Sequence, residues 1–182
     1  MQESFTTPKF ARNVNVEFNK TLNERVSAYF SQRNISKHAN INMVLKTVFM
    51  LALYFVPFAF TFYTDSIWLT LLLWFVAGLG MAGIGLSVMH DANHGAYSSN
   101  QNVNKFVGAV LNLLGGNPTN WKIQHNVLHH SYTNIDGYDE DIDPAGIMRF
   151  SPHQPLKPFY RFQIVYAWFL YGLMTVQWSM DK

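Results

Sequence analysis

Two long apolar runs separated by three polar residues constrain this chain more than any other feature. The runs cover residues 43–63 and 67–89, and only Thr64, Asp65 and Ser66 lie between them. Each run has about the 20 residues that an α-helix needs to cross a bilayer. A connection this short makes two successive helices antiparallel neighbours. We therefore predict a transmembrane helical hairpin rather than the buried hairpin of a soluble protein.

The composition agrees with a membrane protein. Of the 182 residues, 49% are hydrophobic and only 13% are charged, about half the charged share of a soluble domain. The net charge of +2 and the lack of basic clusters argue against nucleic acid as a partner. The absence of cysteine excludes disulfides, thiolate metal sites and thiol nucleophiles.

The remaining segments extend this prediction to an all-α integral membrane protein with interfacial helices. Residues 1–42 contain an amphipathic helix over 14–33, which either packs on the protein or lies on the membrane surface. The region 90–158 contains an apolar stripe over 103–114, too short to span a bilayer. Residues 159–180 form a third apolar span.

The basic residues predict the orientation of these spans. Six Lys or Arg precede Lys46, none lies in the hairpin connection, and five lie between residues 90 and 161. Cytoplasmic loops carry the excess of Lys and Arg in membrane proteins. We expect the N-terminus and the region 90–158 to face the cytoplasm, with a bacterial inner membrane as the favoured location.

Five of the seven histidines lie in two short motifs. HDANH contains His90 and His94, and HNVLHH contains His125, His129 and His130. Residues four apart share one face of an α-helix, so each H-x-x-x-H pair can bind one metal ion. The last histidine lies about 100° around the helix from its neighbour and points to a second ion. Imidazole suits Fe, Zn, Cu and Ni, so the pattern predicts a dinuclear site.

A role in proteolysis, haem binding or metal transport fits the histidines less well. A zinc protease needs H-E-x-x-H, but Asp91 and Asn126 occupy the Glu position. A haem site takes single histidines from separate spans, and a metal transporter places its ligands at mid-bilayer. Polar histidines at a membrane edge account for one or two of these residues but not five. His38 and His153 stand alone and are expected at the surface.

The two motifs, with the context WKIQHNVLHHSYTNIDGYDEDIDP, resemble the first two histidine boxes of the membrane fatty-acid desaturases, in particular the linoleoyl-CoA or front-end type. The resemblance covers nearly the whole chain. It implies two irons bound by His90, His94, His125, His129 and His130, with no catalytic residue separate from these ligands. It also implies use of O2, electrons from a separate ferredoxin or cytochrome, and a double bond introduced into an acyl-CoA or acyl-lipid.

Several more residues are candidates for supporting roles. Four polar side chains can orient the ligand imidazoles: Asp91, Asn126, Asp139 and Asp141. The acidic run that holds the last two can equally be a solvated loop. Trp121 and Tyr132 can line an acyl tunnel, although aromatic residues near an interface also serve as anchors.

The sequence departs from the resembled family in one respect. The family has a third box, H/Q-x-x-H-H, after a fourth span, whereas no histidine follows His153. We therefore expect residues 1–182 to be the N-terminal part of a desaturase domain that binds iron poorly and is inactive alone, because five imidazoles cannot fill two iron coordination spheres. Two alternatives remain: a related membrane di-iron hydroxylase, ketolase or alkane monooxygenase, and a non-catalytic membrane remnant.

Overall fold

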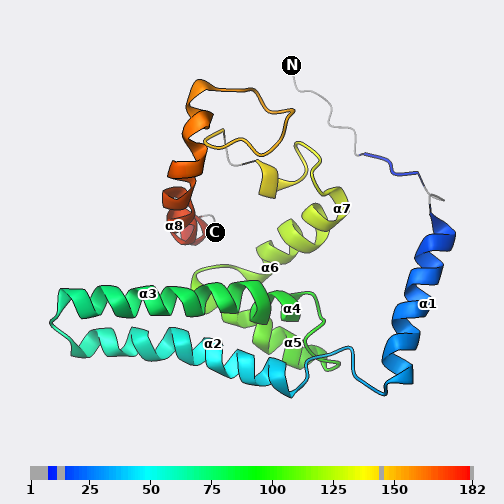
Figure 1. The fold of residues 1–182 in the computed structure, drawn as a ribbon, viewed down its shortest axis with the longest axis horizontal. Coiled ribbons are helices and arrows are strands. Elements are labelled where there is room, and N and C mark those ends of the chain that lie inside the picture. The colour runs from blue at the N-terminus through cyan, green and yellow to red at the C-terminus, as the bar shows by residue number, and fades with distance from the viewer. Residues whose placement is uncertain (1–7, 12–14, 144–145, 181–182) are drawn as a thin grey trace. The chain divides into compact units, whose positions relative to one another are not determined.

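All regular secondary structure in the described part of the chain is helical (Figure 1). The structure, a computed structural model, describes residues 8–11, 15–143 and 146–180. The chain divides into two compact units, Met1–Lys37 and His38–Lys182, which are considered separately.

The described part of the first unit contains one helix, α1, Val16–Gln32, close to the predicted bounds. None of its side chains is buried, and the apolar residues Phe18 and Leu22 are 65% and 47% exposed. The guanidinium of Arg33 lies 4.3 Å from the ring centre of Tyr29. The apolar stripe of α1 is therefore not covered within its own unit, and its predicted place at an interface stays a prediction.

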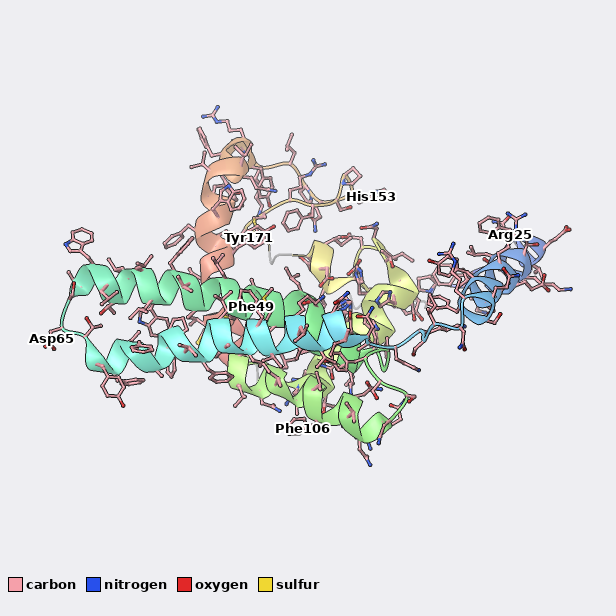
Figure 2. The ribbon with its side chains drawn as sticks, turned by 60° about the horizontal axis from the view of Figure 1, so that its bottom comes forward. Arg25, Phe49, Asp65, Phe106, His153 and Tyr171 are labelled. Atoms are coloured by element: carbon pink, nitrogen blue, oxygen red, sulfur yellow. The ribbon has the colours of Figure 1, made fainter. Side chains whose placement is uncertain are left out.

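The second unit begins with a helical hairpin. Helix α2 spans Ile41–Phe60 and ends in the short 3-10 turn η1, Thr61–Tyr63. Helix α3, Ile67–Gly83, runs back beside it, and Asp65 lies at the tip of the hairpin (Figure 2). The side chain of Ser66 caps α3 by accepting a hydrogen bond from the backbone N–H three residues on, which begins the second helix directly after the turn.

Both arms of the hairpin have the dimensions of membrane spans. The helical stretches Ile41–Tyr63 and Ile67–Asn93 are long and apolar enough to cross a bilayer. Only 11% and 22% of the residues in their most apolar segments are buried. The core helix of a soluble protein buries such residues, whereas these side chains face outward and need an apolar solvent. The structure thus supports the predicted hairpin of two spans.

The small residues spaced four apart, Gly78 with Ala82 and Gly83 with Ser87, predict where a neighbouring helix can approach, and the structure agrees at Gly83 but not at Gly78. Nothing lies within 4 Å of the position that a Cβ on Gly78 would take. A Cβ on Gly80 would instead lie 2.7 Å from the backbone carbon of Leu53 and 2.9 Å from the Cα of Tyr54. A Cβ on Gly83 would clash with Met50. Gly80 is therefore a position at which the backbone of α3 packs directly against the backbone of α2.

Helix α3 continues past the hairpin into the segment that carries the first histidines. It passes through the π-helix η2, Ile84–Met89, into α4, His90–Asn93. Helix α5, Gln101–Gly108, and the 3-10 helix η3, Ala109–Leu114, follow. Leu114 packs with residues of η2 in a buried cluster, while Phe106 on α5 is 79% exposed (Figure 2). The predicted apolar stripe over 103–114 is thus divided between the core and the surroundings.

Short helices then lead to the C-terminal helix. They are α6 (Pro118–Trp121), the π-helix η4 (Lys122–His129), α7 (His130–Tyr132), the 3-10 turns η5 (Glu140–Ile142) and η6 (Pro158–Phe162), and α8 (Gln163–Met180). The cap of α6 is Asn117, whose side chain accepts hydrogen bonds from the backbone N–H groups of Thr119 and Asn120. A third membrane span over 159–180 stays a prediction.

Candidate metal centre

Each histidine motif adjoins a π-helical turn. The segment η2 ends immediately before His90, and η4 contains both His125 and His129. A regular α-helix was expected through the second motif. Single π-turns inside α-helices widen the helix locally and are frequent at functional sites. The rings of His125 and His129 nevertheless stack 5.2 Å apart, so the predicted pairing of these residues on one face is retained.

The fold brings the two motifs together. The Nε2 atoms of His90 and His125 are 3.2 Å apart, although 35 residues separate them in the chain. The ring centres of His94 and His125 are 5.2 Å apart, and those of His94 and His130 are 4.9 Å apart. All five predicted ligands therefore lie in one cluster, and His94 and His130 are its exposed members.

The donor atoms form two overlapping groups. One contains His90, His94 and His125, and the other contains His125, His129 and Asp141; within each group the ligand atoms lie within 4.8 Å of one another. Two nitrogens bound to one metal at about 2.1 Å lie about 3.0 to 3.4 Å apart, a range that includes the separation between His90 and His125. The residues present thus fit a metal centre built mainly from imidazoles.

A buried carboxylate holds the ring of His129. The side chain of Asp139 is fully buried, and its two oxygens lie 3.0 and 3.2 Å from Nδ1 of His129. They also accept the backbone N–H groups of Asn134, at 2.8 Å, and of Asp141, at 3.1 Å. Because a carboxylate accepts hydrogen bonds, Nδ1 of His129 carries the proton and Nε2 is left free to bind a metal.

The other carboxylates near the cluster are more exposed than Asp139. An oxygen of Asp141 lies 3.2 Å from Nδ1 of His129, and its side chain is 60% exposed. Asp91 approaches Nδ1 of its neighbour His90 at 3.2 Å. Glu140 accepts from the amide of Gln124 at 2.7 Å and so ties η5 to the π-helix η4. Among these carboxylates, Asp139 is the one whose burial and hydrogen bonds fix its orientation.

The last three predicted residues divide between the cluster and its surroundings. Trp121 stacks on His125 with ring centres 4.5 Å apart and lies 5.6 Å from the rings of His90 and His94, so it forms one wall of the cluster. Tyr132 packs on Tyr138 instead. The amide of Asn126 donates to the backbone oxygen of Asn93 and not to an imidazole.

The surroundings of His94 and His125 favour the neutral form of these two imidazoles. Burial, together with the neighbouring imidazoles, of which His90 and His130 act most strongly, lowers the pKa of His125 to about 4. Burial and the same two neighbours also lower the pKa of His94. Burial alone would raise the pKa of Asp139, but the hydrogen bonds from Asn134, His129 and Asp141 outweigh it and lower that pKa. The imidazoles of His94 and His125 are thus held in the neutral form that binds metals.

Sequence reasoning missed one residue of the first motif. Asn93 is 5% exposed, and its amide donates to the backbone oxygen of Gly108 at 3.3 Å. Its own backbone oxygen receives the hydrogen bond from Asn126 in the second motif. The sequence did contain a signal, because Asn93 is an uncharged polar residue directly before the predicted ligand His94. Its role could not be read from the motif, because its hydrogen-bond partners lie on other segments of the chain.

Comparison with known proteins agrees with these features. Residues 66–182 match the family described as fatty acid desaturase. The sn-1 linoleoyl-lipid 6-desaturase of Arthrospira platensis is 39% identical over 178 residues, which cover 96% of this chain and 48% of the relative. The protein of the same name from Synechocystis sp. is 38% identical, over 90% of this chain and 46% of the relative.

A more distant relative is the acyl-lipid (8-3)-desaturase of Physcomitrium patens, 33% identical over 94% of this chain and 36% of the relative. The chain spans about half the length of the first two relatives. No solved structure matches it. The family match covers well over half of the chain, including both histidine motifs, and the chain therefore belongs to the fatty acid desaturase family.

Proposed function

We propose that the intact protein is a membrane fatty acyl desaturase. The reaction removes two hydrogens from neighbouring carbons of an acyl chain, and O2 takes these hydrogens and two external electrons with two protons to become two waters. The observation that carries the proposal is the convergence of five imidazoles from two motifs at the end of an apolar hairpin. Breaking an unactivated C–H bond needs a redox cofactor because acid and base side chains cannot do it.

The cluster would supply part of the ligands that two irons need. The ligands would be the five histidines of the motifs, with the carboxylate of Asp141 near the second group. When bound, the irons supply the activation of O2. The chain itself orients the ligands: Asp139 keeps the Nδ1 proton of His129 in place, and Trp121 covers one side of His125 and excludes water there.

The membrane arrangement follows the sequence prediction. We place residues 1–42 and the histidine region 90–158 on the cytoplasmic side, the hairpin 43–63 and 67–89 in the bilayer, and a third span at 159–180. The distribution of Lys and Arg supports this orientation. A separate ferredoxin or cytochrome on the same side would then supply the electrons.

The proposed substrate is an acyl chain esterified in a membrane lipid. The names of three similar proteins describe acyl-lipid desaturases. Such a substrate is held in the bilayer, and the outward-facing apolar hairpin brings the cluster to its edge. Acyl-CoA is the competing carrier. Feeding labelled acyl-CoA and labelled phospholipid in parallel to membranes that contain the protein distinguishes the two.

Iron content and lipid products test the proposal together. Membranes containing the intact protein should accumulate a new unsaturated acyl chain, and the purified protein should contain about two irons. His125→Ala should abolish the product and remove most of the iron, because this residue belongs to both donor groups. His153→Ala is the matched control, since His153 is exposed in the connection before α8 (Figure 2).

Different outcomes separate the alternatives. A hydroxylated acyl chain would identify a hydroxylase, and intact protein without iron or product would favour a non-catalytic membrane protein. A polypeptide limited to residues 1–182 is expected to form no product even with a reductase system, because its imidazoles are too few for two irons. Product from this polypeptide would show that expectation to be wrong.

A further inference from the structure

A hydrogen bond between two asparagines joins the histidine motifs. The side-chain amide of Asn126 donates to the backbone oxygen of Asn93 at 3.0 Å. Asn126 directly follows His125, and Asn93 directly precedes His94. The bond therefore connects α4 to the π-helix η4 at the point where both present their imidazoles.

A second contact anchors Asn93 from the other side. Its buried amide donates to the backbone oxygen of Gly108 on α5 and to the sulfur of Met89, at 3.3 and 3.4 Å. A Cβ at Gly108 would clash with the side-chain oxygen of Asn93, so the close approach depends on glycine. The residue that receives the bond from Asn126 is thus itself held by α5.

These amides are poor choices for stability alone. The side-chain oxygens of Asn93 and Asn126 are buried and find no hydrogen-bond partner within the part of the chain that the structure describes. A buried acceptor without a partner destabilises a fold, and an apolar residue of similar shape avoids this cost. The two amides are therefore better explained by the segments that their NH2 groups hold in place through hydrogen bonds.

We propose that Asn126 and Asn93 form a clip that holds the two histidine motifs at the separation that a shared metal centre requires. Asn126 is then a positioning residue for His125, whose Nε2 lies 3.2 Å from that of His90. His125 lies in the π-helix η4, whose side chains point in directions that differ from those of a regular α-helix. A hydrogen bond from the neighbouring Asn126 can therefore help to fix the position of His125. The metal part of this inference rests on the proposed function.

The first test measures the distance between the motifs without metal. The chain contains no cysteine, so spin labels attached to cysteines introduced at the exposed positions Ser99 and Ser131 report only that pair. The clip predicts a narrow distance distribution in the wild-type background and a clearly broader one in Asn126→Ala. The control Asn112→Ala removes an exposed amide with one local hydrogen bond and should leave the distribution unchanged.

The second test measures iron binding and folding in the intact protein. Asn126→Ala and the volume-conserving Asn126→Leu should weaken iron binding by about 10-fold or more, while Asn112→Ala changes it less than about twofold. The thermal unfolding midpoint of metal-free Asn126→Leu should stay near that of the control. The clip is overturned if all variants bind iron with equal affinity. It is also overturned if the variants lose iron only to the extent that they lose folded protein. Wild-type protein without iron would contradict the proposed function, and the distance measurement would still decide on the clip.

Discussion

Asp139→Asn tests most directly how the protein prepares His129. The two carboxylate oxygens accept one backbone N–H each, from Asn134 and Asp141, and both lie near Nδ1 of His129. An amide has one oxygen, so in either orientation its NH2 group faces one of these backbone donors. The NH2 group of the new Asn side chain also lies beside Nδ1 of His129 and can donate to that nitrogen. This favours the tautomer of His129 with its proton on Nε2, the nitrogen that should bind the metal.

The expected losses follow from these contacts. A hydrogen bond to a charged group contributes about 1.5 to 3 kcal/mol, so we expect the metal-free protein to lose about that much unfolding free energy. Removing a carboxylate that orients a ligand histidine typically weakens metal binding about 10- to 100-fold. Asp141 also approaches Nδ1 of His129 and limits the loss. Chelator competition measures the iron affinity, and denaturant unfolding in detergent measures the stability.

A matched control and a pH series sharpen the test. Asp136→Asn makes the same change at an exposed position of the same loop and should alter neither quantity. The pKa of Asp139 is lowered in the folded protein. Its contribution to the free energy of unfolding is therefore complete above the pKa of the unfolded chain, about 3.9. This contribution is lost as the pH falls through the lower pKa of the folded protein. An iron affinity within about twofold of wild type in folded Asp139→Asn would refute the reasoning.

Three further changes test the fold and the electrostatics. Gly80→Ala should lower the thermal unfolding midpoint of the detergent-solubilised protein by several degrees, because its Cβ meets the backbone of α2, while Gly78→Ala has open space and should not. Tyr97→Phe removes a 2.9 Å hydrogen bond to Thr47 and should cost about 1 kcal/mol of unfolding free energy, and no loss would argue against that contact. The pKa of His125 is lowered to about 4 in the folded protein, so the unfolded chain takes up a proton on this imidazole at a higher pH than the folded protein does. The free energy of unfolding of the metal-free protein should therefore decrease as the pH falls from about 6.5 to about 4. His125→Gln should make this decrease smaller.

Much of the architecture follows from local sequence patterns. The length and polarity of the runs 43–63 and 67–89 predicted the hairpin, since both properties belong to contiguous residues. The H-x-x-x-H spacing predicted that His125 and His129 share a face, and their rings do stack. The glycine at the close helix contact was not predictable, because Gly78 and Gly80 differ only in the direction in which the partner helix lies.

The sequence by itself determined the apolar hairpin, the two histidine motifs and the family, because each is encoded in residue types at fixed local spacing. Only the tertiary structure decided which polar residues serve the cluster. Asp139, and not its neighbouring carboxylates, is buried against His129, at the end of a loop with positive φ angles at Asn134 and Gly137. Asn126 donates a hydrogen bond to Asn93, which lies 33 residues away in the chain. Such choices depend on where separate segments meet in space, and hydrogen bonds between distant segments leave no periodic pattern in the chain.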